Sequence, residues 1–446
     1  MSFVSAETRS VATVDGRLPL VGHAVRLAIG RLRFLQSLRE NGDLVRIYLG
    51  RQPAYVVNSP ELLRTMLMTE AESFDKGRFF DNMRPVLGNG ILTCGTGEHR
   101  RQRPLVQPAF HQERIRRYVD IMAGLAEHAA DSWRPGQVVQ FDHEMHALAL
   151  KIVATTLFAS DLGASAVEET QRLFPLISSG VARRTLTPFP WWERLPTPGN
   201  RRFTAAVDRL RSDIDEVIAA YRQQGVDHGD LLSMLLTARD DDAGGMSDRE
   251  VRDEAVTLMG AGTETSSNSL SWLFHELDRH PEIAGRVRTE VDQVLGDGPV
   301  RYETVRELGY TQQVINEVLR LHAPIWFLMR RVTSPVRLGD LRLDAGTQML
   351  CSPTALHRDH RVFPDPLRFD PDRWRPGAQP PRHAFIPFGL GARRCIGDVF
   401  ARTEMLVITA TIVRRWTLRT ADRRAMREVC SGSLHPARLP MKVLPR

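Results

Sequence analysis

A long helix signal in the second half of the chain restricts the fold more than any other feature of the sequence. Ser247 and Glu250 have the spacing of a capping box, in which the serine oxygen accepts a backbone N–H and the glutamate reaches back to the start of the helix. Apolar residues then recur at helical spacing as far as His280, and Pro281 predicts the end of the helix. The 33 residue steps from Ser247 to His280 correspond to about 50 Å of helix. A helix of this length in a globular protein runs through its core.

The middle of this helix, Gly260–Ser266, is polar and rich in small residues. Each glycine destabilises a helix interior by about 0.8–1 kcal/mol relative to alanine, and serine or threonine weakens it further by bonding the carbonyl four residues earlier. Two explanations are open for such a segment. Either a neighbouring helix packs closely against the small residues, or a ligand lies in a groove against exposed backbone.

The remainder of the 446 residues predicts a mainly α-helical protein with a small β lobe. We expect a short helix at Val25–Asn41, a β-hairpin at about 44–57, and mostly helices from 60 to about 300. A second strand-rich stretch covers about 332–350, and its strands should pair with the N-terminal hairpin. Since no repeat or linker divides the sequence, we predict a single domain over residues 1–446.

Composition and charge exclude several classes of protein. With 42% hydrophobic and 25% charged residues, the chain is globular rather than disordered. The net charge of +7 favours at most a basic face for an acidic protein, because no helix-turn-helix, zinc or RNA-binding motif indicates a nucleic-acid partner. The N-terminal region has no uninterrupted apolar run, so we expect no membrane span. Four cysteines without a C-x-x-C pair predict a reducing, cytoplasmic setting.

The segment Phe388–Gly397 carries the most chemical information. Its three glycines permit a tight loop around Cys395, and the two arginines before the cysteine favour its thiolate, which is the form that binds metals. Helix-forming residues follow from Phe400 to Val413, so a helix N-terminus lies near enough to stabilise the negative charge. Zinc is disfavoured because no second cysteine or suitably spaced histidine is nearby. One anionic sulfur, covered by Phe388, fits the axial ligand of a haem iron.

The same segment matches the pattern Phe-x-x-Gly-x-Arg-x-Cys-x-Gly, and the chain resembles a cytochrome P-450 monooxygenase along nearly its whole length. Four further segments agree with that family in order and spacing. They are Ala261–Thr265 for the oxygen-binding groove of the long helix, Glu317–Arg320 for the Glu-x-x-Arg motif, Phe369–Trp374 for an arginine-bearing loop, and His99–Arg103 for the haem-facing helix. The resemblance implies the cytochrome P-450 fold, with haem b between the long central helix and the helix after the cysteine loop.

The resemblance also implies roles for individual residues. Cys395 would be the axial thiolate ligand of the iron, and Glu264 and Thr265 would be the acid–alcohol pair that delivers protons to dioxygen. Haem propionates need cations, and guanidinium groups match carboxylates well. The residues implied to bind the cofactor besides Cys395 are His99, Arg103, Ala261, Gly262, Arg330 (or Arg331 if the register is shifted by one), Phe388, Gly389, Arg393 and Gly397.

A structural triad is implied as well. Glu317 and Arg320 are three residues apart on an otherwise apolar helix, so they share one face and are expected to be buried. Buried charges need partners, and Arg373 would complete the group.

The implied reaction inserts one oxygen atom from dioxygen into a lipophilic small molecule. Electrons would come from NAD(P)H through ferredoxin reductase and an acidic ferredoxin, which we expect to meet Arg100, Arg101 and Arg394 on a monomeric enzyme. A haem protein that senses or transfers electrons without oxygen chemistry is the alternative from another class, and the Glu264–Thr265 pair argues against it.

The substrate class is indicated only by the particular residues that occur within the motifs. Leu356–Asp359 and Arg373–Trp374 look closest to terpene-oxidising and fatty-acid-oxidising members of the family. We therefore expect a terpenoid of bacterial secondary metabolism in a large apolar pocket. The aromatic residues that the resemblance implies for this pocket are Phe79, Phe80, Phe189, Trp191, Trp192, Trp326 and Phe327. Trp191 and Trp192 have a second interpretation, as the surface packing of a loop. Fatty acids, polyketides, and aromatic or peptide-derived natural products are the alternatives.

Overall fold

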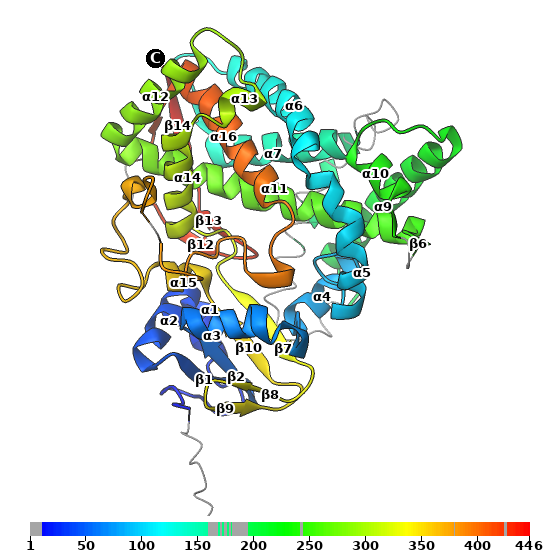
Figure 1. Cartoon of the computed structure of the whole chain (residues 1–446), viewed down its shortest axis with the longest axis vertical. Coiled ribbons are helices and arrows are strands. Elements are labelled where there is room, and N and C mark those ends of the chain that lie inside the picture. The colour runs from blue at the N-terminus through cyan, green and yellow to red at the C-terminus, as the bar shows by residue number, and fades with distance from the viewer. Residues whose placement is uncertain are drawn as a thin grey trace, which may run out of the picture. The chain divides into compact units, whose positions relative to one another are not determined.

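Figure 1 shows a computed structural model of the chain, which forms two compact units. The structure describes residues 11–158, 168–169, 172–173, 176–177, 180, 195–240, 244–378, 380–422 and 426–446. Unit 1 comprises Met1–Asp81, Ile325–Arg368 and Gln379–Cys395, and unit 2 comprises Asn82–Pro324, Phe369–Ala378 and Ile396–Arg446. A single domain over residues 1–446 stays a prediction.

Unit 1 is built on a five-stranded sheet that is discontinuous in sequence. In sheet order its strands are β1 (Leu44–Leu49), β2 (Gln52–Val57), β10 (Gln348–Cys351), β7 (Leu328–Val332) and β3 (Phe74–Asp75). The strands β1 and β2 form the expected hairpin, and β10 joins β2 in parallel. The predicted pairing of the two strand-rich stretches is confirmed. A small hairpin of β8 (Val336–Leu338) and β9 (Leu341–Leu343) completes the strands.

The helices of unit 1 are short. They are α1 (Ala24–Ile29), α2 (Arg31–Ser37), η1 (Leu38–Asn41), α3 (Pro60–Arg64), η2 (Thr65–Thr69), η3 (Ala71–Ser73), α15 (Pro353–His357) and η8 (Gly391–Arg393). The continuous helix expected at Val25–Asn41 is wrong, because Gly30 leaves the helical conformation with φ −136° and ψ 57°. Leu63, Met66 and Leu67 pack with the buried face of the sheet and form the apolar core of the unit.

Unit 2 is mostly helical. Its elements are the larger part of α4 (Arg78–Leu87), α5 (Thr96–Val106), η4 (Gln107–Phe110), α6 (Gln112–Asp131), α7 (Phe141–Leu157), α9 (Pro198–Gln224), α10 (Leu231–Thr237), α11 (Asp248–Arg279), α12 (Pro281–Leu295), α13 (Tyr302–Val305), α14 (Gly309–Leu321), η7 (Pro371–Trp374) and α16 (Asp398–Arg415). Short strands edge this helical body: β4 (Val138–Gln140), β5 (Arg239–Asp240), β6 (Gly244–Gly245), β11 (Trp416–Thr420), β12 (Glu428–Cys430), β13 (Leu434–Pro436) and β14 (Pro440–Pro445).

The predicted long helix is confirmed as α11, which crosses the middle of unit 2 in Figure 1. Ser247 caps it, with the predicted capping box to Glu250, and the helix ends before His280. Helices α7, α9, α14 and α16 pack against it. Its Trp272 is almost completely buried, so this end of the helix lies in the core as its length required.

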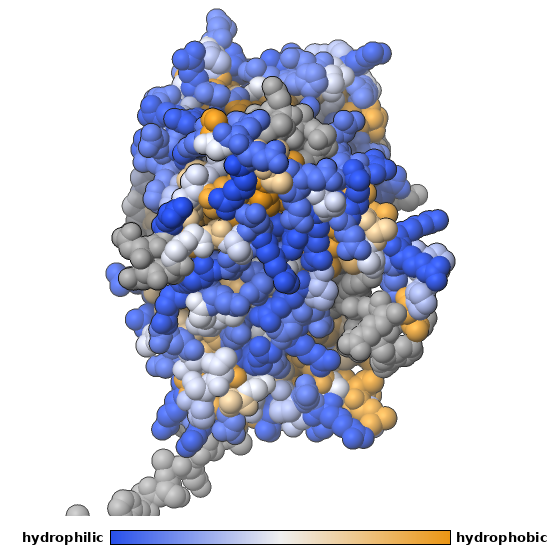
Figure 2. Space-filling view, turned by 90° about the vertical axis from the view of Figure 1, so that its right-hand side faces the viewer, coloured by the Kyte–Doolittle hydropathy of each residue, from blue (hydrophilic) through white to orange (hydrophobic). Residues whose placement is uncertain are grey.

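Hydrophilic side chains cover most of the face shown in Figure 2, and the apolar patches on that face are small. Among the described residues, no helix is long and apolar enough to cross a membrane.

Candidate functional site

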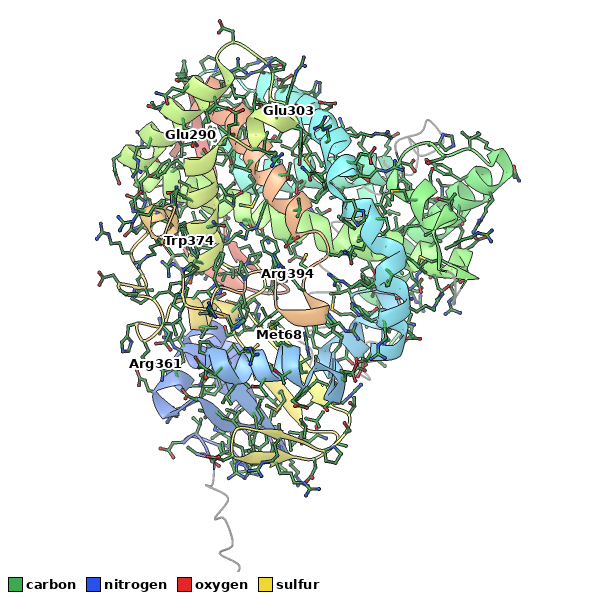
Figure 3. The ribbon with its side chains drawn as sticks, in the orientation of Figure 1. Met68, Glu290, Glu303, Arg361, Trp374 and Arg394 are labelled. Atoms are coloured by element: carbon green, nitrogen blue, oxygen red, sulfur yellow. The ribbon has the colours of Figure 1, made fainter. Side chains whose placement is uncertain are left out.

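The cysteine loop of unit 1 folds as its glycines predicted. The Cys395 N–H donates to the Phe388 carbonyl at 2.9 Å and closes the loop. Gly389 and Gly391 have φ values of 73° and 71°, which side chains rarely adopt. A Cβ on Gly391 would also lie 1.9 Å from the carbonyl oxygen of Leu67, so the loop packs directly on the backbone of η2. Figure 3 labels Arg394 in this loop and Met68, another residue of η2.

Cys395 differs from the other cysteines in its exposure. Cys94 and Cys351 are buried and Cys430 is half-buried, whereas Cys395 is exposed. The covering of the sulfur by Phe388 stays a prediction. The helix α16 begins at Asp398, three residues after the cysteine. The loop thus presents a sulfur next to two arginines in sequence and just before a helix N-terminus, which is the setting that favours a thiolate.

Two arginines predicted to bind propionates are gathered in unit 1. Arg330 on β7 is buried, and its Nη1 donates to the Met329 carbonyl at 2.8 Å. Burial lowers the pKa of Arg330 to about 10, and the charge of Arg393 acts in the same direction. The Arg393 guanidinium lies 3.6 Å from Asp75. Arg330 and Arg393 thus bring positive charge to a desolvated part of unit 1, which an anion would stabilise.

Strand alternation distinguishes Arg330 from Arg331, the two candidates for the same role on β7. Successive side chains of a strand point to opposite faces. The side chain of Arg331 is half-buried and pairs with Asp81 at 2.7 Å and Asp75 at 3.7 Å. Of the two, Arg330 is the buried residue, and its role toward a propionate stays a prediction.

The centre of α11 supports close helix packing at one of its small residues, and a ligand groove beside the others stays a prediction. A Cβ on Gly262 would lie 2.9 Å from a methyl carbon of Val153 on α7, so close helix packing explains this glycine. The neighbouring Ala261 is exposed. The Thr265 hydroxyl donates to the Ala261 carbonyl at 2.8 Å, which is the helix-weakening bond expected for this segment. The oxygen of that hydroxyl can still accept a hydrogen bond.

Glu264 is held by a residue that the sequence did not indicate. The buried Ser433 hydroxyl donates to Glu264 Oε1 at 2.6 Å, and Asn268 Nδ2 donates to the Ser433 oxygen at 2.7 Å. Ser433 follows β12, 169 residues after Glu264. No sequence spacing reports such a contact, because it depends on how the hairpin of β12 and β13 packs on α11.

The helix α5 carries His99 and Arg103, of which His99 is buried. The loop before it is fastened to α11: Asp253 Oδ2 accepts from the Asn89 N–H and Glu254 Oε1 from the Ile91 N–H, both at 2.8 Å. These two carboxylates were missed from sequence. Arg101, expected to meet a ferredoxin, forms an ion pair with Glu250. Its charge is therefore largely neutralised within unit 2, which weakens that expectation for Arg101.

The buried triad has the predicted contacts. Glu317 and Arg320 are both completely buried and form two hydrogen bonds, at 2.8 and 2.9 Å. Arg373 reaches Glu317 at 3.3 Å. The indole of Trp374, labelled in Figure 3, donates to the second carboxylate oxygen at 2.9 Å. The sequence identified the arginines but not the tryptophan, because an indole donor has no charge to suggest a partner.

The aromatic pocket residues divide into two groups. Phe79 stacks edge-on against Phe80 and Phe327 in unit 1, with ring centroids 5.0 and 4.9 Å apart. Trp191 and Trp192, also expected in the pocket, lie outside the described residues.

Comparison with known proteins decides the family. The model of the Cytochrome P450 family matches residues 14–441. The chain belongs to the cytochrome P450 family. This P450 is 41% identical to "Cyclooctat-9-en-7-ol 5-monooxygenase" of Streptomyces melanosporofaciens, over 98% of this chain and 96% of that protein. It is 38% identical to "Pentalenene oxygenase" of Streptomyces avermitilis, over 99% of both chains.

Solved structures agree with this membership at the level of fold. The P450 superimposes on "Retinoic acid bound cyanobacterial CYP120A1" with a TM-score of 0.87 and 24% identity, covering 98% of this chain and 99% of the other. The predicted cytochrome P-450 fold is therefore confirmed. As a P450, the protein is a haem-thiolate monooxygenase that receives its electrons from redox partners and acts on a lipophilic substrate.

Proposed function

We propose that this P450 inserts one oxygen atom into a terpenoid of bacterial secondary metabolism. The observation that carries the proposal is the exposed Cys395 at the end of its glycine loop, in a chain that matches two named terpenoid-type oxygenases over nearly its full length. Fatty acids, polyketides and aromatic or peptide-derived products are the competing substrates.

Haem b would be held with the Cys395 thiolate as the ligand of its iron. In unit 1 the desolvated pair Arg330 and Arg393 fits the propionates, since a buried excess of positive charge favours an anion. By their resemblance to the family's haem-facing helix, His99 and Arg103 would take the same role. The other proposed contacts come from Ala261, Gly262, Phe388, Gly389 and Gly397. When bound, a haem thiolate supplies the redox chemistry that activates dioxygen.

Glu264 and Thr265 would move protons for this chemistry. The Thr265 oxygen would accept a hydrogen bond from a water molecule, and the Glu264 carboxylate would exchange protons with it, so that each proton arrives from a positioned group. Glu317, Arg320 and Arg373 would have a structural role only, because their contacts satisfy one another within the helical core.

The electron donors in this proposal are a ferredoxin and its NAD(P)H-dependent reductase, and the enzyme would work as a cytoplasmic monomer. The exposed Arg100 and Arg394 remain the proposed docking cations. Electrostatic steering predicts that reduction slows as ionic strength rises. Reduction rates that do not depend on salt would remove this part of the proposal.

Replacing the ligand tests the chemistry most directly. Cys395→Ala should abolish the red-shifted absorbance band of the reduced carbon monoxide complex. Cys430→Ala is the matched control, since this half-buried cysteine lies in β12 and should keep the band. A purified Cys395→Ala protein with an unchanged band would contradict the assignment.

A spectral titration tests the substrate class. Terpene hydrocarbons, fatty acids and polyketides are added separately to the ferric protein, and displacement of water from the iron is followed by absorbance. We expect the strongest response from the terpenes. A response only to fatty acids or polyketides would contradict the terpenoid proposal. Trp326 is buried and its ring packs against Phe327, so Trp326→Ala should weaken the spectral response to a substrate that binds in the pocket.

A further inference from the structure

Two contacts and one charge interaction surround the Glu264 carboxylate. Its Oε1 accepts the Ser433 hydroxyl at 2.6 Å. A Cβ on Gly432 would lie 3.4 Å from Oε1 and 3.7 Å from Oε2, so the backbone of this turn abuts the carboxylate. His146 on α7 interacts electrostatically with Glu264. Burial lowers the pKa of His146, and the charge of the Glu264 carboxylate opposes that effect in part. A neutral imidazole gives the carboxylate no full positive charge, so the Ser433 hydroxyl is the strong donor in these contacts.

The direction of the hydrogen bonds follows from the chemistry of the groups. The Asn268 amide nitrogen can only donate, and it does so to the Ser433 oxygen at 2.7 Å. The single hydroxyl proton of Ser433 must therefore point to Glu264. An O–H···O⁻ bond of this length is of the strong, charge-assisted kind.

The turn that carries Ser433 is itself fixed to the helices of unit 2. The Leu434 N–H donates to the Pro324 carbonyl at 2.8 Å, and the Trp272 indole donates to the Leu434 carbonyl at 3.3 Å. At the other end of the hairpin, His322 lies 3.3 Å from Glu428. The hydroxyl is thus presented from a supported element, which is the arrangement that holds a functional side chain in one geometry.

We propose that Ser433 is a positioning residue for oxygen activation: with Asn268 it fixes the rotamer from which Glu264 delivers protons. The inference rests on the proposed function of Glu264 and extends it to residues outside every motif. Without the hydroxyl, the carboxylate would sample other rotamers and deliver protons less often. Dioxygen that has taken two electrons would then leave more often with two protons as hydrogen peroxide, and less often be reduced further to water.

Turnover without added substrate tests the proposal in the holoenzyme. NADPH and a surrogate ferredoxin–reductase pair drive oxygen consumption, and hydrogen peroxide per NADPH is measured. Ser433→Ala and Glu264→Gln should each raise this ratio about two- to five-fold, and the double variant should not exceed Glu264→Gln alone. Ser433→Thr keeps a hydroxyl and should restore most of the wild-type ratio. Ser431→Ala is the control, since its hydroxyl bonds His435 at 3.1 Å in the same turn, and it should leave the ratio unchanged.

A second readout does not depend on turnover. The infrared difference spectrum between the ferric wild type and Glu264→Gln identifies the Glu264 carboxylate band, and Ser433→Ala should shift that band while Ser431→Ala should not. If Glu264→Gln raises the peroxide ratio but Ser433→Ala leaves both ratio and band unchanged, the positioning role is overturned and the proposed function stands. If Glu264→Gln itself has no effect on the ratio, the proton-delivery function fails and the positioning role fails with it. Retention of the carbon monoxide band shows that each variant is folded.

Discussion

Two completely buried glutamates in unit 2 have opposite surroundings. Glu317 on α14 bonds two guanidinium groups, the Trp374 indole and the Asp370 N–H. Glu404 on α16 is as deeply buried, and burial raises its pKa to about 8, an effect that the Ser266 hydroxyl offsets only in part. Hydrogen-bond and ion-pair partners, rather than the extent of burial, decide whether a buried carboxyl group carries charge.

Two further glutamates extend the comparison. Glu254 accepts one backbone N–H, and burial raises its pKa to about 8. Burial also acts to raise the pKa of Glu276, but the hydrogen bond from His322, 2.9 Å away, and the electrostatic effects of His322, His275 and Arg279 together outweigh it, so the pKa falls below its ordinary value. One hydrogen-bond donor does not offset desolvation at Glu254, whereas a hydrogen bond and three nearby basic groups together do so at Glu276.

Removing a cation from Glu317 should have the largest effect. Arg320→Leu leaves a buried carboxylate with one guanidinium at the edge of the core, so we expect a loss of about 3–5 kcal/mol in unfolding free energy. Urea unfolding of the haem-loaded protein measures it. A loss below about 1 kcal/mol would mean that charge pairing is not what stabilises this region.

The His322–Glu276 pair should show a smaller effect with a defined pH dependence. His322→Phe keeps an aromatic ring against Trp272, whose centroid is 4.1 Å away, but removes the donor to Glu276. We expect a loss of about 2–3 kcal/mol at pH 7. Because the folded pKa of Glu276 lies below its ordinary 4.5, its stabilisation is present above pH 4.5 and disappears as the pH falls through the folded value. The difference between variant and wild type should therefore shrink in acid, and a constant difference from pH 7 to pH 3 would contradict the assignment.

Glu404 should show the opposite pH dependence. Its folded pKa of about 8 exceeds the ordinary 4.5, so between these values the folded state holds a proton that the unfolded state has lost. Stability then falls as the pH rises, by at most about 1.4 kcal/mol per pH unit for one group. Glu404→Gln should match wild type at pH 4.5 and exceed it by about 1–2 kcal/mol at pH 6. The variant still contains Glu254, so the part of the pH dependence of stability that comes from Glu254 should be the same in variant and wild type. Equal stability at pH 6 would show that Glu404 is not neutral in the folded protein.

The smallest effect is expected at the edge of the triad. Arg373→Ala leaves Glu317 with Arg320 and Trp374, and the Arg373 side chain is 15% exposed. We expect a loss of about 1 kcal/mol by urea unfolding. A loss equal to that of Arg320→Leu would show that the two arginines act as one unit.

Sequence reasoning succeeded where the relevant geometry is local. The capping box of α11 and the shared face of Glu317 and Arg320 depend on spacings of three residues, which a helix converts directly into contact. The glycine loop before Cys395 is similarly local, since its positive φ angles need particular residue types.

It failed where local preference competes with packing. The helix across Gly30 was expected from apolar spacing, but the glycine leaves the helical region and the chain restarts as a second helix. The sequence also could not show why residue 262 is a glycine, because close helix packing and ligand binding both favour a small residue.

The sequence by itself determined the family, the mainly helical fold, the cysteine loop and the charged triad. Each of these depends on particular residue types a few positions apart. Only the tertiary structure decided which arginine of β7 is buried, which carboxyl groups lose their charge, and that Ser433 holds Glu264 across 169 residues. Desolvation and long-range contacts arise when segments pack together, and no spacing along a single chain encodes them.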